Sequence, residues 1–295
     1  MKEIILSIIF LTSISICYSQ KTNKQLQLKV EETIKGFNGE IGVYIKNLKT
    51  GKIVAINADT VFPTASIVKI PILLGIMNKL QNGELSYHQQ FIYKDSLLYE
   101  GEDILGSFKN NESIQLAKLL MLMLTTSDNT ASLWLQSIAG TGTRINTILD
   151  SLGFVATRIN SRTTGREELR NIYGWGQTSP REMAMLLEKI YHKEIFSDGI
   201  CIQMMRLLGR NYWDEEGLSQ IPPTIEVFSK NGAVNASRSE VMLVNAPNNP
   251  YLFCIITKNN KDQSWSSSNE AWMLTKKLSA MLWNYFEPGM KYISE

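Results

Sequence analysis

The stretch from Phe62 to Pro71 restricts the fold of this chain more than any other part of it. It follows a strand-like region and opens an apolar segment, Ile67 to about Leu80, that predicts a long helix. On a helix, Ser66 and Lys69 share one face because they are three residues apart. A buried lysine with a lowered pKa can activate a serine hydroxyl as a nucleophile by accepting its proton. The same spacing also fits a plain helix start with an exposed lysine.

Two later motifs favour the catalytic interpretation. Ser127-Asp128-Asn129 and then Lys230-Asn231-Gly232 follow the serine and lysine along the chain. Ser-x-x-Lys, Ser-Asp-Asn and Lys-x-Gly, in this order, form the motif set of class A β-lactamases and penicillin-binding proteins. The residues that flank the first two motifs match as well. The chain therefore resembles the class A β-lactamases over nearly all of its mature length.

The order of the predicted elements agrees with an α/β (α+β, three-layer) fold. Hydrophobic periodicity predicts a helix, two strands, a run of helices, three strands and a final helix. This order indicates an antiparallel sheet of about five strands, flanked by the terminal helices, with an all-helical subdomain inserted between the second and third strands. We expect residues 20–62 and 195–295 to form the α/β subdomain and residues 63–194 the helical subdomain. Residues 153–179 are expected to be a long irregular loop.

The amino-terminal residues 1–19 have the pattern of a secretory signal peptide. Lys2 precedes an apolar run, Ile4–Ile16, that is too short to span a bilayer, and Ser19 suits cleavage. A lipidated Cys17 is the alternative, although Ile16 is bulky for the residue before such a site. No later segment of 18 apolar residues follows. We therefore expect export across the inner membrane to the periplasm without stable membrane insertion.

Composition argues against several other classes of function. The net charge of +2, without a run of like charges, gives no reason to expect nucleic acid as a partner. His88 and His192 have no context of a catalytic triad, and no zinc motif occurs, so neither a metal nor another cofactor is expected. Cys201 and Cys254 can form a disulfide in an oxidising compartment, but we expect two buried thiols.

The resemblance implies a role for each residue of the first two motifs. Ser66 is expected to be acylated, and Lys69 to take or relay its proton. Ser127 is expected to pass a proton to the leaving nitrogen. Asn129 is expected to bind an acylamide group of the substrate, to hold Lys69 and to cap the next helix. Asp128 is expected to brace the loop by accepting backbone N–H groups.

The third motif is expected to bind the substrate. Lys230 would place positive charge near Ser127 and the substrate carboxylate, and Gly232 would let the substrate lie against the strand. Backbone N–H groups of Ser66 and Ala233 would form the oxyanion hole. Asn231 stands where the family usually has Thr or Ser. Arg238 is expected either to bind the substrate carboxylate or to form a surface ion pair with Glu240.

The resemblance leaves the base for deacylation open. Class A enzymes hold the hydrolytic water with a loop glutamate and an asparagine, in the pattern R-x-E-x-x-L-N. Here the corresponding stretch runs from Arg166 to Asn171, and the loop that follows is shorter. Alignment on the arginine selects Glu168, alignment on the asparagine selects Glu167, and alignment on Leu169 places Arg166 at the glutamate position. Glu167 and Glu168 fit solvated charges without a catalytic role equally well.

Three functional hypotheses follow. The first is a monomeric serine β-lactamase with a small-molecule substrate. The second is a related D-alanyl-D-alanine peptidase or esterase that β-lactams acylate but that turns them over poorly. The third is a non-catalytic penicillin-recognising module, which the intact serines and lysines argue against.

Overall fold

Five antiparallel strands form the central sheet of the computed structural model, which describes residues 21–99 and 103–294. The predicted antiparallel sheet of about five strands is therefore confirmed. The predicted signal peptide and Cys17 lie outside the described residues. The strands follow the order β2 (Ile53–Ile56), β1 (Glu40–Asn47), β10 (Tyr251–Lys258), β9 (Ser237–Val244) and β8 (Val227–Val234).

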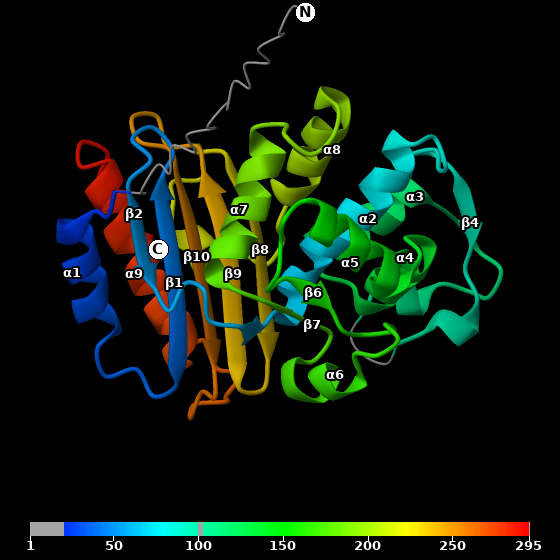
Figure 1. Ribbon diagram of the computed structural model, residues 1–295, viewed down its shortest axis with the longest axis horizontal. Helices are drawn as coiled ribbons and strands as arrows, with labels where there is room; N and C mark the ends of the chain where they lie inside the picture. Colours follow the sequence, from blue (N-terminus) through cyan, green and yellow to red (C-terminus); the bar gives the residue numbers. More distant parts are fainter. Residues whose placement is uncertain (1–20, 100–102, 295) are drawn as a thin grey trace, which may run out of the picture.

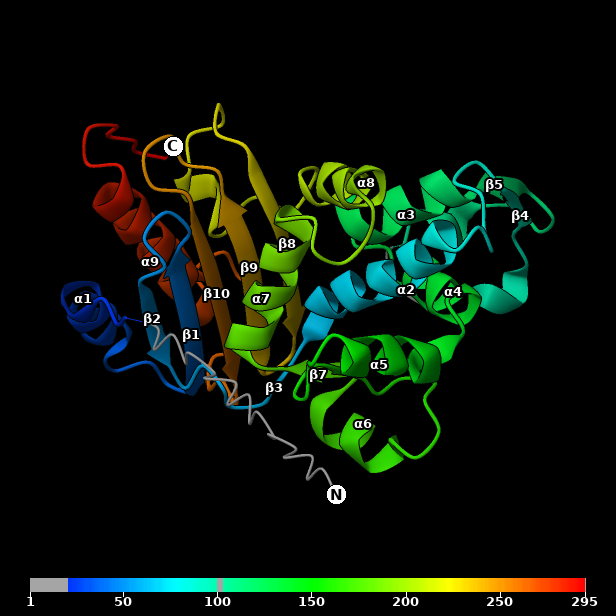
Figure 2. The same ribbon diagram turned by 45° about the horizontal axis from the view of Figure 1, so that its top comes forward.

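Helices cover both faces of this sheet (Figures 1 and 2). The terminal helices α1 (Lys24–Ile34) and α9 (Glu270–Phe286) pack on one face, and α7 (Pro180–Tyr191) packs on the other. The side chains of β9 alternate accordingly. Met242 and Val244 belong to the core beneath α9, whereas Val241 and Leu243 belong to the core shared with the helical region. Each strand thus joins two hydrophobic cores.

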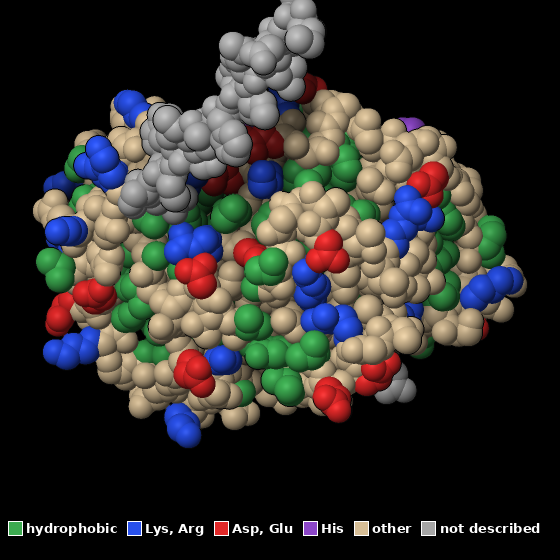
Figure 3. All heavy atoms as spheres, in the orientation of Figure 1, with side chains coloured by type: hydrophobic (Ala, Val, Ile, Leu, Met, Phe, Trp, Pro, Cys, Tyr) green, Lys and Arg blue, Asp and Glu red, His purple; other side chains and the backbone are tan. Residues whose placement is uncertain are grey.

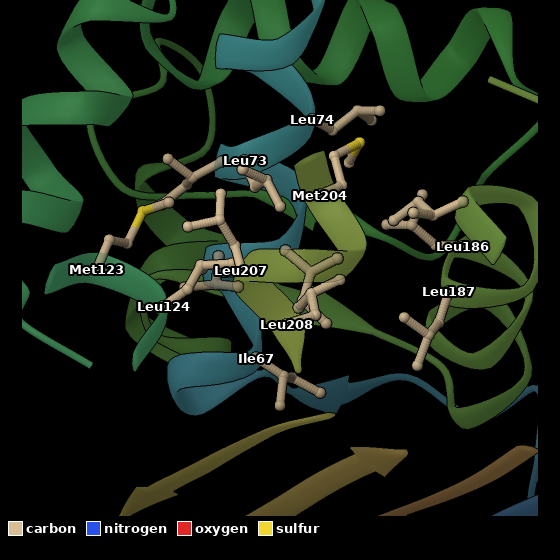
Figure 4. Close-up of a cluster of buried hydrophobic side chains, with 14 of the residues drawn as sticks. Ile67, Leu73, Leu74, Met123, Leu124, Leu186, Leu187, Met204, Leu207 and Leu208 are labelled. Atoms are coloured by element: carbon tan, nitrogen blue, oxygen red, sulfur yellow. The ribbon is translucent and has the colours of Figure 1, made fainter. Parts of the chain in front are cut away.

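The helical region lies beyond the β8 edge of the sheet and is built around α2 (Lys69–Gln81). Helix α2 is buried from Lys69 to Met77 because its neighbours surround it. Figure 4 shows Leu73 and Leu74 of α2 among apolar side chains from α3, α7 and α8. The other helices of the region are α3 (Leu116–Thr125), α4 (Asn129–Ile138), α5 (Thr141–Ser151), α6 (Glu167–Tyr173) and α8 (Asp198–Leu208).

Short strands and 3₁₀ turns complete the region. A small sheet has the order β3 (Phe62–Pro63), β7 (Gly176–Thr178), β6 (Arg158–Ile159), and a second one pairs β4 (Gln90–Ile92) with β5 (Ser113–Gln115). The 3₁₀ turns are η1 (Ala65–Val68), η2 (Asp95–Leu97), η3 (Leu105–Ser107) and η4 (Leu218–Gln220).

The expectation of an irregular loop over 153–179 was wrong in part. This stretch contains β6, α6 and β7, and β7 pairs with β3, which lies more than a hundred residues earlier in the chain. Such short strands depend on a distant partner and carry little local signal. The division into subdomains remains a prediction. Helix α7 nevertheless lies on the sheet, and α8 packs against α2 and α3.

The distribution of surface charges and the state of the two described cysteines match what the sequence led us to expect. Lysine, arginine and carboxylate side chains intermingle on the face seen in Figure 3. Cys201 and Cys254 are buried free thiols, as expected. Within residues 21–99 and 103–294, no helix is both long and apolar enough to cross a bilayer.

Candidate active site

Ser66 and Lys69 lie where the 3₁₀ turn η1 continues into α2. The short strand before them is held by β7, and Thr64 N–H donates to the Gly176 carbonyl at 3.0 Å. Ala65 has a positive φ of 46°, a conformation that costs energy for a residue with a side chain. In Figure 2 the amino-terminal end of α2 lies beside β8. Ser66 is half-buried there.

Lys69 is fully buried and is the centre of the polar contacts. Its Nζ is 3.1 Å from Ser66 Oγ, 2.9 Å from Ser127 Oγ and 2.9 Å from Asn129 Oδ1, and it also donates to the Ser127 carbonyl. Burial lowers the pKa of Lys69 well below its ordinary value, and the Lys230 charge lowers it further. The carboxylates of Asp103 and Asp128 oppose this. A neutral amine at this position can accept the Ser66 proton.

Ser127 occupies the turn between α3 and α4 with a φ of 62°. Buried Asp128 holds the turn, because its carboxylate accepts Leu105 N–H at 2.8 Å and Ala131 N–H at 2.7 Å. The bracing role predicted for Asp128 is thus confirmed. Asp128 is also the N-cap of α4, so the expectation that Asn129 caps this helix was wrong. The Asn129 side chain contacts Lys69 instead, as predicted.

Lys230 and Gly232 approach the nucleophile from the edge strand β8. Lys230 is fully buried, and burial lowers its pKa to about 7, although the charges of Glu240 and Glu216 favour the protonated form. A Cβ atom on Gly232 would lie 2.5 Å from Ser66 N and 2.8 Å from Ser239 Oγ. Glycine is therefore required here by the close approach of the chain itself.

The same strand places the backbone of Ala233 next to this contact. Ser239, opposite Gly232 on β9, donates from its hydroxyl to the Thr64 carbonyl at 2.9 Å and so fastens the sheet to the turn before Ser66. This arrangement supports the predicted oxyanion hole of Ser66 N–H and Ala233 N–H, which remains a prediction. Asn231 lies at the strand edge, where its Oδ1 accepts Lys230 Nζ at 3.2 Å.

The structure places Arg238 away from the site, so the proposed contact with the substrate carboxylate was wrong. Its guanidinium lies over the rings of Trp265 and Trp272, with centroid distances of 4.8 Å and 4.6 Å, on the α9 face of the sheet. It donates to the Ser237 carbonyl at 3.0 Å and the Ser264 carbonyl at 2.8 Å. The alternative of a surface ion pair was wrong too, because Arg238 and Glu240 are both buried. Neighbouring residues on a strand point to opposite faces, so a shift of one residue in the alignment moves a side chain from the site to the other face of the sheet.

Glu167 and Glu168 lie in the first turn of α6, and both are exposed. Glu167 accepts Gly165 N–H at 3.2 Å. Among the described residues, the hydrogen bonds of Ser66 Oγ lead to Lys69 and not to either glutamate. Arg166 instead ties the loop together by donating to Asn160 Oδ1 at 2.7 Å and Gln177 Oε1 at 3.0 Å. The base for deacylation stays an open prediction.

Two residues of the site were not foreseen from the sequence. Asp103 accepts the backbone N–H of Asn129 at 3.0 Å and of Thr130 at 2.7 Å, and so holds the start of α4 from the other side. Glu216 accepts Asn231 Nδ2 at 3.2 Å. The signal for Glu216 was weak, because it ends an acidic run after Trp213 in a segment without periodicity.

Comparison with known proteins agrees with this geometry. The profile of the Beta-lactamase enzyme family matches residues 25–286. Beta-lactamase VEB-1 of Pseudomonas aeruginosa is 24% identical over 294 residues, which cover 96% of each chain. The structure of a mutant of PBP-A, an acyl-enzyme complex with penicillin G, superposes with a TM-score of 0.79 at 23% identity, covering 91% of this chain and 98% of that one. A β-lactamase from Sphaerobacter thermophilus has a TM-score of 0.79 at 19% identity, covering 91% of this chain and 99% of its own.

Proposed function

The chain belongs to the β-lactamase enzyme family, and on this premise we propose that it is a serine β-lactamase that opens the lactam amide through an acyl-enzyme on Ser66. The observation that carries the proposal is the contact of Ser66 Oγ with a buried lysine whose pKa is far below its ordinary value. A buried amine of this kind is a competent base for a hydroxyl at hydrogen-bond distance.

Acylation then follows from the contacts around Lys69. Ser66 Oγ attacks the lactam carbonyl carbon, its proton passes to Lys69 Nζ, and the C–N bond breaks after the tetrahedral intermediate. The Ser127 hydroxyl, 2.9 Å from Lys69 Nζ, donates a proton to the leaving nitrogen and regains one from the ammonium. Protonated Lys230 attracts the substrate carboxylate. Backbone N–H groups of Ser66 and Ala233 stabilise the oxyanion.

Hydrolysis of the acyl-enzyme requires a water and a base. Glu167 and Glu168 are the candidates from the sequence, but both are exposed on α6. This exposure favours a second candidate function, an exported peptidase or esterase that β-lactams acylate and that releases them slowly. The solved acyl-enzyme of mutant PBP-A with penicillin G supports acylation in both cases, because that protein shares this fold.

Intact-protein mass spectrometry distinguishes the two functions. Mature protein is mixed with a penicillin and sampled from seconds to hours, with Ser66→Ala as the control. A transient adduct together with accumulating hydrolysed penicillin is expected for a β-lactamase. A persistent adduct moves the assignment to the peptidase or esterase. If no adduct forms and no penicillin is hydrolysed, both functions and the role of Lys69 are contradicted.

We further propose that the protein acts as a periplasmic monomer. The signal-like residues 1–19 support export, and a secreted β-lactamase would confer resistance to its substrates. The amino terminus of protein recovered from the periplasm should begin at Gln20. A lipid-modified amino terminus at Cys17 in the membrane fraction would contradict this.

A further inference from the structure

Both the oxygen and the nitrogen of the Asn231 side-chain amide form hydrogen bonds within the protein, next to the proposed substrate site. Its Oδ1 accepts Lys230 Nζ at 3.2 Å, and the Lys230 ammonium also donates to the Asn231 carbonyl at 2.9 Å. Its Nδ2 donates to Glu216 Oε2 at 3.2 Å and to the Trp213 carbonyl at 3.3 Å. A threonine or serine hydroxyl is too short to bridge groups on both sides in this way.

We propose that Glu216 and Asn231 form a hydrogen-bonded relay that positions the Lys230 ammonium and keeps it charged for the substrate carboxylate. The proposal rests on the proposed function, because it concerns how the same site binds its substrate. Glu216 and Asn231 are positioning residues in this account, since they act through Lys230. The relay also explains why this chain tolerates an amide in the Lys-x-Gly motif.

The loop that carries Glu216 is fastened to the opposite wall of the site. Tyr212 N–H donates to the Thr125 carbonyl at 3.0 Å, and Trp213 Nε1 donates to the Thr126 carbonyl at 2.9 Å. These carbonyls directly precede Ser127. The loop therefore bridges the Ser127 turn and strand β8, so that the Glu216 carboxylate has a defined place beside Asn231.

Lys230 is fully buried and its pKa lies at about 7, so small changes in the surrounding charges alter its protonated fraction near neutral pH. Two carboxyl groups, Glu240 on β9 and Glu216 on the loop, favour its protonated form. Lys69 on α2 is a further basic group at this site, and the Lys230 charge lowers its pKa. The loss of the Glu216 carboxylate should therefore lower the pKa of Lys230 further and leave it less protonated in the neutral pH range.

Glu216 is the better placed of the two carboxyl groups to remain charged. Glu240 is buried and its pKa is raised to about 8 by burial; within the described part of the chain, its Oε1 has no hydrogen-bond partner. Glu216 is only half-buried; burial raises its pKa as well, but the hydrogen bond from Asn231 and the Lys276 charge oppose that rise. The Glu215 charge acts in the opposite direction. Glu216 also lies within the electrostatic reach of buried Arg238.

Glu216→Gln is the direct test, with the exposed neighbour Glu215→Gln as the matched control. The rate constant of acylation by a fluorescent penicillin is measured from about pH 5.5 to 9 for both variants and the parent. Glu216→Gln keeps the shape but removes the charge, so Lys230 should lose its proton at lower pH. We expect acylation at about pH 8.5 to fall on the order of tenfold, with little change at pH 5.5. Glu215→Gln should follow the parent.

Asn231→Ser tests whether the effect runs through the amide. If it does, Glu216→Gln should change the pH profile less in the Asn231→Ser background than in the parent. An equal change in both backgrounds would mean a simple charge effect and would overturn the relay. A Glu216→Gln profile identical to that of Glu215→Gln would overturn it as well.

A spectroscopic titration of Lys230 tests the relay without depending on acylation, and so separately from the proposed function. In protein labelled with ¹³Cε-lysine, the Lys230 resonance is assigned by its absence from Lys230→Met, and its titration is followed by NMR. A titration that moves to lower pH in Glu216→Gln, and that moves less in the Asn231→Ser background, supports the relay even if penicillins fail to acylate Ser66. An unmoved titration contradicts the relay even if acylation is fast.

Discussion

At the scale of single residues, the site contains two backbone conformations that L-amino acids avoid. Ala65 and Ser127 both have positive φ, and each costs about 1–3 kcal/mol. Hydrogen bonds on either side compensate. Ser239 holds the Thr64 carbonyl, and Asp128 holds the turn after Ser127. The conformations turn two hydroxyl groups toward the same lysine, which no regular helix start would do.

Gly232→Ala should strongly slow acylation while leaving the fold intact. The new methyl group would stand 2.5 Å from Ser66 N and 3.1 Å from Ala65 Cβ, so the nucleophile turn must shift. A shift of about 1 Å at reacting atoms typically costs on the order of a hundredfold in rate. The acylation rate and the urea unfolding midpoint are the measurements.

Gly199→Ala is the control for this substitution. Gly199 lies in α8, and a Cβ there meets no atom within 4 Å. Acylation should be unchanged, and the protein should be as stable or slightly more stable. If Gly232→Ala acylated at the parental rate, the contact between β8 and Ser66 would not be as close as the structure has it.

Arg238→Lys should destabilise the protein without altering substrate binding. The guanidinium stacks against two tryptophan rings and donates to several backbone carbonyls, and an ammonium cannot reproduce that geometry. We expect a loss of about 2–4 kcal/mol in the free energy of unfolding and an unchanged KM for penicillin. A KM raised many-fold at unchanged stability would instead restore the substrate role for this arginine.

At the scale of elements, short segments place the catalytic groups and long ones support them. Helix α2 is buried along most of its length and gives η1 a rigid base. The pairing of β3 with β7 and the N-cap at Asp128 then set the two turns that approach it. Helix α6 is different. It has no buried residue, and Arg166 just before it donates to Asn160 and Gln177.

Glu167→Gln and Glu168→Gln should each leave the release of the penicilloyl group nearly unchanged. Both carboxylates are exposed, and a base for deacylation must reach the ester directly or through one water. The decay of the acyl-enzyme after removal of free penicillin is the measurement, with Glu194→Gln as an exposed control. A fall of about a hundredfold or more for one variant would identify that glutamate as the base and would require α6 to move on acylation.

At the scale of the whole molecule, two hydrophobic cores meet at the sheet, and the site lies along its β8 edge. This arrangement buries ionisable groups, among them Lys69, Lys230 and Glu240. Their titration couples stability to pH, because each has a different pKa in the unfolded chain.

Glu240→Gln should flatten the dependence of stability on pH between about 5 and 7. In the folded protein the Glu240 pKa is about 8, above its ordinary 4.5, so the folded state binds more protons than the unfolded state in this window. The contribution of Glu240 to stability should therefore fall as pH rises, by on the order of 2 kcal/mol, whereas Lys69, with its lowered pKa, acts with the opposite sign in parent and variant alike. Above pH 7, unfolding in urea would also report Lys230, whose lowered pKa acts with the opposite sign.

The control for this titration is Glu32→Gln, which removes an exposed carboxylate from α1. Its urea unfolding curves should follow those of the parent at every pH. If the free energy of unfolding of Glu240→Gln changed with pH as steeply as that of the parent, Glu240 would have the same pKa in the folded and unfolded chains.

The fold class, the family resemblance and the motif residues Ser66, Lys69, Ser127 and Lys230 could be predicted from the chain alone. These depend on local spacing and on apolar periodicity, which a helix or strand expresses wherever it lies. The terminal helices, the hairpin and the start of α7 at Ser179 were predictable for the same reason.

Which of the remaining candidates face the site depends on how the elements pack against one another. Arg238 points to the opposite side because strand register changes the face of a side chain with each residue. Glu216 and Asp103 join the site through contacts across more than ten residues of chain, which no local pattern records. The burial that lowers the pKa of Lys69 is likewise a property of the packed molecule, because it requires α2, β8 and the Ser127 turn to meet.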